Sequence, residues 1–397
     1  MPVKSDTTTR PAVLQVIPDL NTGGAERTTV DVAAALVAKG WRAVVVSEGG
    51  RLVPELEALG AKHIILPVKS KNPLTILANA RRLKQVAQAE SISLIHARSR
   101  APAWSALMAA RSLKLPFVTT YHGIYKQKGA LKSWYNSVMA RGDCVIANSR
   151  YTADLVAARH EFARGKITVI YRGSDIAALA SEAVTVERRA ALVAAWGVDG
   201  SRPILLQLAR LTGWKGQKVL IAAMAELKAR GATLPLAIIA GDDQGRSGYL
   251  AELKAQIAAA GLEGDVRLVG HCADVPAALS LSSLSVVASI EPEAFGRAAV
   301  EAQAACVPVI VSDLGAVPET VLAPPEVPED ARTGWRVPPG DAAALAGAIS
   351  GVLALAPDAR AALVERAQGH VARHFTVEAM CASTLEAYAG LLGRRAE

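Results

Sequence analysis

The chain has 397 residues, of which 51% are hydrophobic and 20% are charged. At roughly 100–200 residues per domain this length predicts two or three domains, and the composition excludes a disordered or fibrous protein. No apolar run reaches the roughly 18 residues of a membrane span, and the polar first ten residues do not resemble a signal peptide. We therefore expect a cytoplasmic protein.

The positive charge is concentrated in the first half of the chain. Residues 1–180 hold 25 Lys and Arg against 12 Asp and Glu, whereas the remainder holds 19 against 24. This asymmetry suggests that the first half faces something anionic, either a membrane surface, a phosphorylated acceptor or a nucleic acid. An ordinary solvated surface is an equally good explanation. No nucleic-acid recognition motif accompanies the charge, so we do not expect a nucleic-acid partner.

The cysteines give no sign of a metal centre or a disulfide framework. The four of them lie far apart without paired spacing, at Cys144, Cys272, Cys306 and Cys381. The neighbouring Asp242 and Asp243 are typical turn formers, and no organised set of oxygen ligands surrounds them in the sequence. The sequence therefore predicts neither a bound metal nor another cofactor.

Short β-branched runs alternate with amphipathic stretches through the first half. The predicted strands are Val13–Pro18, Ala43–Ser47, His63–Val68, Leu94–Ala97, Phe117–Tyr121, Cys144–Ser149 and Ile167–Tyr171, with helices that include Ala25–Lys39 and Thr75–Glu90. Strands that alternate with helices are typical of a parallel sheet covered by helices on both faces. The first half is therefore expected to be a doubly wound α/β domain.

The second half repeats this alternation after an Ala-rich, charged stretch without strand signal. Its predicted strands are Ile204–Ala209, Leu236–Gly241, Val266–Gly270, Leu284–Ile290, Val307–Ser312 and Trp335–Val337, with helices that include Gln217–Arg230, Tyr249–Ala260 and a last one near Thr376–Gly393. We predict domains over 1–178 and 203–375, a linker over 179–202, and a final helix over 376–397 that packs back on the first domain. In such folds ligands bind at the carboxyl ends of the strands.

The segment from Glu291 to Ala302 has the clearest chemistry. It leaves a predicted strand and enters a helix, whose free N–H groups and dipole favour an anion. Gly296 allows a ligand to approach the backbone closely. Glu293 and Glu301 offer strong acceptors for sugar hydroxyls. The same pattern is also expected if Glu293 is an ordinary solvated loop residue and Glu301 an ordinary carboxylate near the start of a helix.

Arg210 and Lys215 occupy a second strand-to-helix connection. A planar guanidinium and a point-charge ammonium suit a diphosphate, and cations at a helix start are unfavourable unless an anion is present. Gly23 and Gly24 lie between the first strand and its helix, which by itself is a weak phosphate signal. His122 follows a strand, where it either bonds a hydroxyl, shuttles a proton or is merely structural.

Taken in order, these segments resemble family-4 retaining glycosyltransferases of the GT-B fold over nearly the whole chain. The motifs that carry the resemblance begin with Gly23-Gly24-Ala-Glu-Arg, His122-Gly123 and Ala147-Asn-Ser149, continue with Arg210…Lys215-Gly, Gly241-Asp242 and Val266-x-x-Val-Gly270, and end with Glu293-Ala-Phe-Gly-x4-Glu301-Ala, Pro308-Val-Ile and Thr333-Gly-Trp-x-Val-Pro-Pro-Gly-Asp341. The resemblance implies two Rossmann-like domains that face each other across a cleft, and sugar transfer from a nucleotide-sugar donor, UDP- or GDP-linked, without a metal.

The resemblance also assigns roles to single residues. Glu293 would bind hydroxyls of the donor sugar, and Glu301 the nucleotide ribose. Arg210 and Lys215 would neutralise the leaving diphosphate, which is where charge develops when the sugar–phosphate bond breaks. Further contacts to the donor would come from backbone N–H groups near Gly23, Gly24, Ala294, Phe295 and Gly296, with His122 close to the sugar.

The chain departs from the family pattern in two places. Cys306 stands where the family usually ends a helix with Gly, a position that favours the left-handed conformation. If that geometry is kept, the Cys side chain should cost up to about 1–2 kcal/mol. Gly315-Ala316 stands where the family often has Gly-Gly.

The acceptor is expected to bind through the basic first domain. The segment Tyr121–Tyr135 mixes Lys126, Lys128 and Lys132 with Tyr125 and Trp134, which suits the interface of an anionic membrane as well as an ordinary solvated helix. We therefore expect a glycan or lipid-linked acceptor, synthesis of lipopolysaccharide or another cell-surface polysaccharide, and peripheral attachment to the cytoplasmic face of the inner membrane. A sugar-nucleotide epimerase of the same architecture and a non-enzymatic sugar-binding protein remain alternatives.

Overall fold

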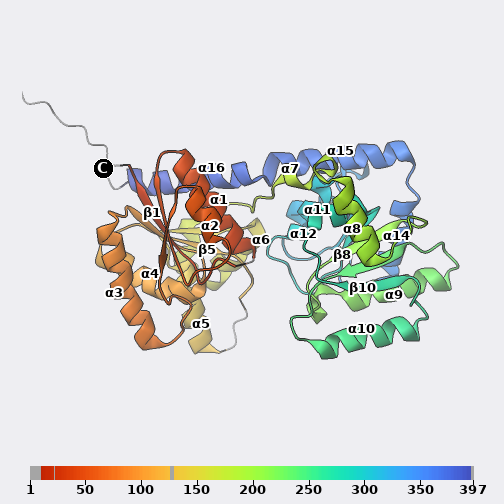
Figure 1. Ribbon diagram of the computed structural model, residues 1–397, viewed down its shortest axis with the longest axis horizontal. Coiled ribbons are helices and arrows are strands. Elements are labelled where there is room, and N and C mark those ends of the chain that lie inside the picture. Colours follow the sequence, from red (N-terminus) through yellow and green to blue (C-terminus); the bar gives the residue numbers. More distant parts are fainter. Residues whose placement is uncertain (1–9, 22, 126–128, 395–397) are drawn as a thin grey trace, which may run out of the picture. The chain divides into compact units, whose positions relative to one another are not determined.

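The computed structural model describes residues 10–21, 23–125 and 129–394. The chain divides into two compact units, one formed by residues 1–173 and 377–397 and the other by residues 174–376. Each unit holds one parallel sheet with helices on its faces (Figure 1). The α/β class and the doubly wound architecture predicted from the sequence are confirmed.

The first unit is built on a seven-stranded sheet in the order β3-β2-β1-β4-β5-β6-β7. Its strands are β1 Ala12–Val16, β2 Arg42–Ser47, β3 Lys62–Ile65, β4 Leu94–Ala97, β5 Phe117–Tyr121, β6 Cys144–Ala147 and β7 Ile167–Val169. Its helices are α1 Gly24–Ala38, α2 Val53–Ala58, α3 Pro73–Ala89, α4 Arg100–Ser112, α5 Ala130–Asn136, α6 Arg150–Arg159 and α16 Val377–Gly393. Every strand pair is parallel, and most strand residues are buried because both faces are covered.

Separate apolar clusters fill the two faces of this sheet. Alternate strand residues such as Val13 and Val45 pack with residues of α1 and α16. The residues between them, such as Leu14 and Val44, pack with residues of α3 and α4. Because side chains of a strand alternate between the faces, one strand contributes to both cores.

The second unit is built on a six-stranded sheet in the order β10-β9-β8-β11-β12-β13. Its strands are β8 Ile204–Leu208, β9 Leu236–Ala240, β10 Val266–Gly270, β11 Leu284–Val287, β12 Val309–Ser312 and β13 Trp335–Val337. Its helices are α7 Ile176–Leu179, α8 Val186–Trp196, α9 Gln217–Ala229, α10 Ser247–Ala259, α11 Val275–Ser280, α12 Arg297–Ala304, α13 Val317–Thr320, α14 Ala342–Leu353 and α15 Pro357–His374. The order reverses between β8 and β11, which makes the loops after these two strands a natural ligand site.

The boundaries of the units differ in detail from the predicted domains. Residues 179–202, predicted as a linker, lie within the second unit, where α8 packs on α11. Helix α16 belongs to the first unit, where it packs on α1. The stretch after β7 lacks strand signal because it forms helices that complete the second unit.

No single helix within the described ranges is long and apolar enough to cross a membrane; α14 and α15 pass that test only as a pair, across a bend of 110°.

Candidate functional site

The loops after β8 and β11 are joined by backbone contacts at the point where the strand order reverses. The Ile290 N–H donates to the carbonyl of Trp214 at 2.8 Å. Gly216 has a φ of 71°, and a Cβ there would lie 1.7 Å from the carbonyl oxygen of Ala288. Only glycine allows this approach, so the loop after β8 is pressed directly against the loop after β11.

This packing brings Lys215 to Glu293. The Lys215 Nζ lies 2.6 Å from the Glu293 Oε1, and both side chains are largely buried, with 16% and 11% of their surface exposed. Ser289 donates its hydroxyl to the same carboxylate oxygen at 2.5 Å. The Lys215 Nζ also lies 4.2 Å from the centre of the Trp214 ring. An ammonium and a carboxylate are thus in contact close to the starts of α9 and α12.

A neighbouring loop fixes the backbone of Glu293. Glu293 forms an isolated parallel bridge with Gly315, and its carbonyl accepts from the Ala316 N–H at 3.0 Å. A Cβ on Gly315 would lie 2.5 Å from the Glu293 carbonyl oxygen, so this position requires glycine. The departure at Ala316 leaves this contact intact, because Ala316 contributes its backbone.

Helix α12 starts directly after this loop. Gly296 caps it in the left-handed conformation without any side-chain hydrogen bond to the first turn. The first N–H groups of a helix have no partner within it, so this end can receive an anion. The Phe295 side chain is buried against Phe375, with ring centres 5.5 Å apart, so only its backbone is in a position to face a ligand.

The other residues predicted for the second unit are less tightly held. Glu301 lies on α12 and pairs with Arg297 at 2.7 Å. The Arg210 side chain is exposed and makes no ion pair within the described ranges, while its carbonyl accepts from Gln217 Nε2 at 3.0 Å. Because an exposed guanidinium keeps its rotamer freedom, Arg210 is available to an incoming anion.

A cavity of about 240 Å³ lies beside the Arg210 loop. It is lined by Leu211, Gly241, Asp242, Asp243, Leu250, Lys254, Leu268, Gly270 and His271. Leu211 comes from the loop after β8, and the other residues come from the carboxyl ends of β9 and β10 and from α10, so the cavity continues the same edge of the sheet. It has the mixed apolar and polar lining that suits a flat heterocycle.

Gly23, Gly24 and His122 belong to the first unit, where each follows a strand of the sheet. Gly23 caps α1 without a side-chain hydrogen bond, and Gly24 is the first helical residue. The Glu26 carboxyl folds back toward Gly23, where an added Cβ would lie 2.2 Å from its Oε2. Burial raises the pKa of this carboxyl.

His122 is held by Arg172, a residue that does not stand out in the sequence. The Arg172 Nη2 lies 3.2 Å from the His122 Nδ1 and also donates to the His122 carbonyl at 3.2 Å. Burial, followed by the charges of Arg172 and Arg98, lowers the pKa of His122 well below its usual value. At neutral pH the ring is therefore uncharged.

His96 lies on β4 of the first unit. In the structure His96 is buried and bonds Tyr388 at 2.5 Å and Thr120 at 2.7 Å. These contacts tie α16 to the sheet of the first unit. A structural role for His96 follows.

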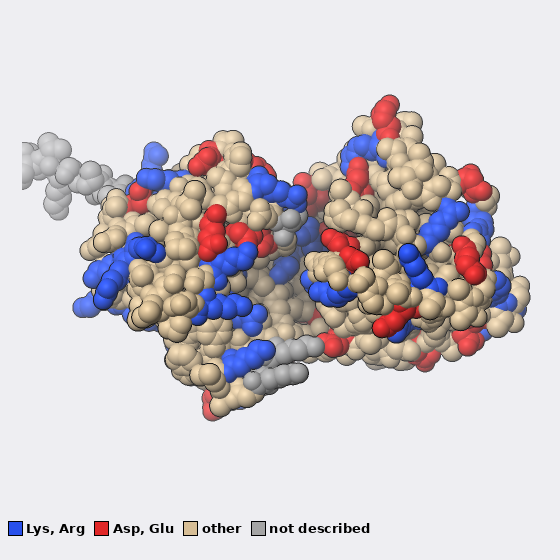
Figure 2. Space-filling model, turned by 60° about the horizontal axis from the view of Figure 1, so that its bottom comes forward, with Lys and Arg blue, Asp and Glu red and all other residues tan. Residues whose placement is uncertain are grey.

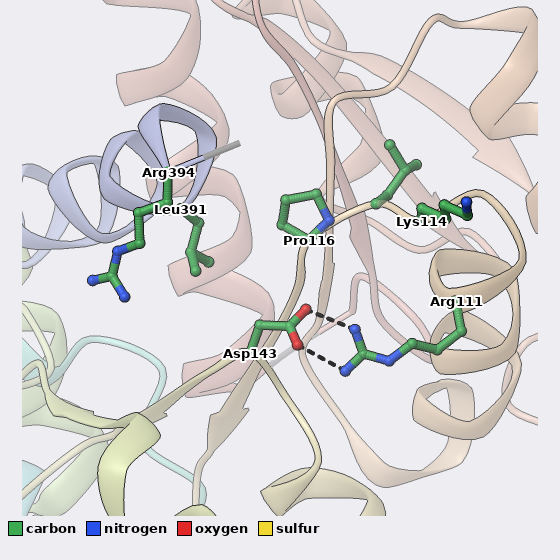
Figure 3. A pocket seen from close by; sticks show the side chains of 7 residues that line it. Arg111, Lys114, Pro116, Asp143, Leu391 and Arg394 are labelled. Carbon is green, nitrogen blue, oxygen red and sulfur yellow. Dashed lines mark hydrogen bonds and ion pairs between the residues drawn. The ribbon is translucent and has the colours of Figure 1, made fainter. Parts of the chain in front are cut away.

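A second cavity, of about 420 Å³, lies at the opposite edge of the first sheet (Figure 3). Pro116 and Asp143, which line it, directly precede β5 and β6. The Arg111 guanidinium is turned toward the Asp143 carboxylate, and its two bonds measure 2.8 Å each (Figure 3). This cavity is therefore remote from the carboxyl ends of the strands, and two of its four charged side chains, Arg111 and Asp143, already pair with each other.

Two family models match the chain almost end to end. Residues 22–178 match Glycosyltransferase Family 4, and residues 189–370 match Glycosyl transferases group 1. A glycosyltransferase from Rickettsia africae ESF-5 has a similar structure, with 32% identity, a TM-score of 0.86, and coverage of 97% of this chain and 99% of that one.

Two further relatives name a ligand or a pathway. Anabaena HepE in complex with UDP-glucose is 25% identical, with a TM-score of 0.78 and coverage of 96% of this chain and 99% of that one. The lipopolysaccharide core biosynthesis mannosyltransferase LpsB of Rhizobium meliloti (strain 1021) is 27% identical over 68% of this chain and 74% of its own length. The chain spans about half the length of the first curated relatives it matches.

The matched models, the Rickettsia structure and the two parallel sheets agree with one another, and they show that the chain belongs to glycosyltransferase family 4, with the GT-B fold.

Proposed function

We propose that the protein transfers a sugar, with retention of anomeric configuration, from a nucleotide-sugar donor to a glycan or lipid-linked acceptor. The shielded pair of Lys215 and Glu293 at the start of α12 carries this proposal. A nucleotide sugar needs a cation for its diphosphate and an acceptor for its sugar hydroxyls within one site. Lys215 supplies the first and Glu293 the second.

The electrostatics of the site suit departure of a diphosphate. Negative charge grows on the diphosphate as the sugar–phosphate bond breaks, while the sugar becomes electron-poor. Lys215, the exposed Arg210 and the first N–H groups of α12 oppose that negative charge. Because two cations and a helix end supply this stabilisation, we propose that the reaction needs no metal.

The donor is proposed to be UDP- or GDP-linked. HepE binds UDP-glucose, and the cavity beside Leu211 and His271 offers room for a base next to the diphosphate residues. Glu301, paired with Arg297 on the first turns of α12, is proposed to hold the ribose. This role of Glu301 implies that its carboxylate is shared between Arg297 and the ribose when the nucleotide binds.

The pathway is proposed from the relatives. LpsB of Rhizobium meliloti acts in lipopolysaccharide core biosynthesis, so an acceptor of the cell-surface polysaccharide class is favoured for this chain. A sugar-nucleotide epimerase remains the second candidate for the same donor site. The two differ in what they do without an acceptor, because an epimerase changes the donor alone.

Purified protein should be mixed with UDP-glucose, UDP-galactose or GDP-mannose, with and without a lipopolysaccharide core acceptor and with EDTA throughout. We expect a rise in melting temperature with one donor class, since a ligand that binds only the folded state stabilises it. We also expect sugar transfer that depends on the acceptor, with the donor's anomeric configuration retained in the product by NMR. Epimerised donor without acceptor, or an inverted product, would contradict the proposal.

We further propose peripheral attachment to the cytoplasmic face of the inner membrane through α3 and α5. Exposed apolar side chains stand on both helices, with Leu74 77% and Leu131 80% exposed and Trp134 55% exposed. Consecutive residues of α4 link the two helices, since Ser105 donates to the Ile76 carbonyl and Trp104 stacks on Trp134. The apolar residues thus share one region of the first unit.

Basic residues border this region. Lys71 precedes α3, and Lys132 lies on α5 between the two apolar side chains; both are exposed. Lys and Arg side chains are also prominent on the part of the first unit seen in Figure 2. Tyr125, by contrast, faces inward, where it lies against Tyr121 and under Arg100, and Lys126 and Lys128 fall outside the described residues.

A further inference from the structure

The carboxylate of Glu293 is held through one of its two oxygens. Oε1 accepts from the Ser289 hydroxyl at 2.5 Å and lies 2.6 Å from the Lys215 Nζ. Oε2 makes no hydrogen bond to any residue that the structure describes. An ionised carboxylate has about four acceptor positions, so Oε2 keeps its lone pairs for donors from a ligand. Of the two oxygens, Oε2 is therefore the one left to receive a sugar hydroxyl.

Backbone contacts fix Ser289 on both sides. The carbonyl of Ala288 lies directly against Gly216, and the Ile290 N–H donates to the Trp214 carbonyl at 2.8 Å. Ser289 itself is 3% exposed, so its hydroxyl is enclosed by the surrounding residues. A group held in this way by its neighbours keeps its geometry without reorganisation when a ligand binds. The Ser289 hydroxyl is thus in place before a donor arrives.

The two contacts to Oε1 differ in how a diphosphate would affect them. Lys215 is charged, and a diphosphate competes for it as negative charge grows on the leaving group. Ser289 is neutral and lies four residues before Glu293 in the same loop. Because a hydroxyl has one hydrogen, Ser289 cannot donate to the diphosphate while it donates to Glu293. The serine can therefore hold Oε1 while the lysine turns to the diphosphate.

We infer that Ser289 is a positioning residue, which anchors Oε1 of Glu293 independently of Lys215 and so directs Oε2 to a hydroxyl of the donor sugar. This inference rests on the proposed function, because it needs a sugar in contact with Glu293. The anchor matters most in the transition state, where Lys215 is drawn most strongly to the diphosphate. Loss of an interaction that matters only there lowers kcat rather than raising KM.

The kinetics of Ser289→Ala would test this role. The change removes one oxygen and should lower kcat about tenfold, the size of one hydrogen bond to a charged group, while KM for the nucleotide sugar changes less than about threefold. Ser282→Ala is the matched control, because Ser282 precedes β11 as closely as Ser289 follows it and donates to the Ala278 carbonyl at 2.7 Å. This control should leave kcat unchanged. A raised KM without loss of kcat, or equal losses in both variants, would overturn the inference.

The free nucleotide distinguishes a positioning role from general damage to the site. UDP and GDP lack the sugar that Oε2 would bind, so Ser289→Ala should bind the preferred one within about twofold of the wild-type affinity. Ser289→Thr keeps the hydroxyl and should recover part of the lost rate. Tenfold weaker binding of the free nucleotide would assign Ser289 to the phosphate site instead. Failure of Thr to recover any rate, in a protein that unfolds like the wild type, would also contradict positioning.

Unfolding in urea tests the anchor without a donor. Ser289→Ala should lower the urea midpoint of the wild type but not that of Glu293→Ala, because the bond is already absent there. In Lys215→Met the same change should still lower the midpoint, since the anchor does not need the lysine. Equal shifts in the wild type and in Glu293→Ala would show that Ser289 does not act on Glu293. Because no substrate is needed, this measurement separates failure of the inference from failure of the proposed function.

Discussion

At the scale of single residues, two ion pairs of equal length differ in what surrounds them. Lys215 and Glu293 are 2.6 Å apart and nearly shielded from water, whereas Lys218 and Glu252 are also 2.6 Å apart with 49% and 57% of their side chains exposed. An exposed pair contributes little, while removal of one partner from a shielded pair leaves a charge without compensation. Only the shielded pair lies where a diphosphate is proposed to bind.

Lys215→Met should therefore lower kcat/KM for transfer by about 10²–10³, as when one preorganised donor to a transition-state charge is lost. Lys218→Met, a lysine-to-methionine change three residues along the chain, should stay within about twofold. Initial rates measured at a temperature where thermal unfolding shows both variants folded would check this. Equal activity of the two variants would remove Lys215 from the site.

Single residues also show what the sequence could indicate about the site. Lys215 and Glu293 stand out because each lies between a strand and a helix. Arg172 does not, because its place beside His122 depends on a contact across 50 residues of chain, and the inward orientation of the Phe295 side chain depends likewise on Phe375. Gly315 shows the same limit, since its reason for being glycine is the backbone of Glu293.

At the scale of elements, the strands were predictable and the ends of the helices were less so. Each predicted strand corresponds to one of β1–β13, because most of these strands are short, largely apolar runs that can be recognised without tertiary information. Residues 179–202, predicted as a linker, belong to the second unit because α8 within them packs on α11. Packing between elements, which the sequence does not display, decided that case.

The backbone at the end of α12 is strained at Cys306, and this strain can be tested. The Cys306 N–H donates to the Gln303 carbonyl and the Val307 N–H to the Ala302 carbonyl, which is the double bond pattern of a left-handed helix end. Cys306 keeps that conformation, with a φ of 59°, although it has a side chain. The geometry expected of glycine is thus retained.

Cys306→Gly should raise the free energy of unfolding by about 0.5–1 kcal/mol. The substitution removes about 1–2 kcal/mol of backbone strain from the left-handed residue. Part of this gain in stability is lost, because glycine makes the unfolded chain more flexible. Because Cys306 is exposed, little packing is lost. Urea unfolding followed by circular dichroism would measure the change. Cys306→Ala keeps the Cβ, so an equal gain there would show that strain is not the cause.

At the scale of the whole molecule, charge and exposed apolar surface coincide. Residues 1–180 carry the excess of Lys and Arg, and the same part of the chain contains α3 and α5 with their exposed leucines and Trp134. Apolar side chains supply binding energy only once they leave water, while basic residues attract an anionic surface from a distance. Neither feature alone would favour a membrane, but together they do.

Flotation with liposomes would test this attachment. Wild-type protein should float with vesicles that contain phosphatidylglycerol at low salt, and less with phosphatidylcholine alone or at high salt, because salt screens the attraction. The double variant Leu131→Ser and Trp134→Ser should bind about tenfold more weakly, since two side chains no longer leave water. Val186→Ser is the matched control, because Val186 is an apolar residue of α8 that is 76% exposed in the second unit. A loss of binding with Val186→Ser equal to that of the double variant would contradict the proposed attachment through α3 and α5. So would a wild-type protein that does not float with anionic vesicles.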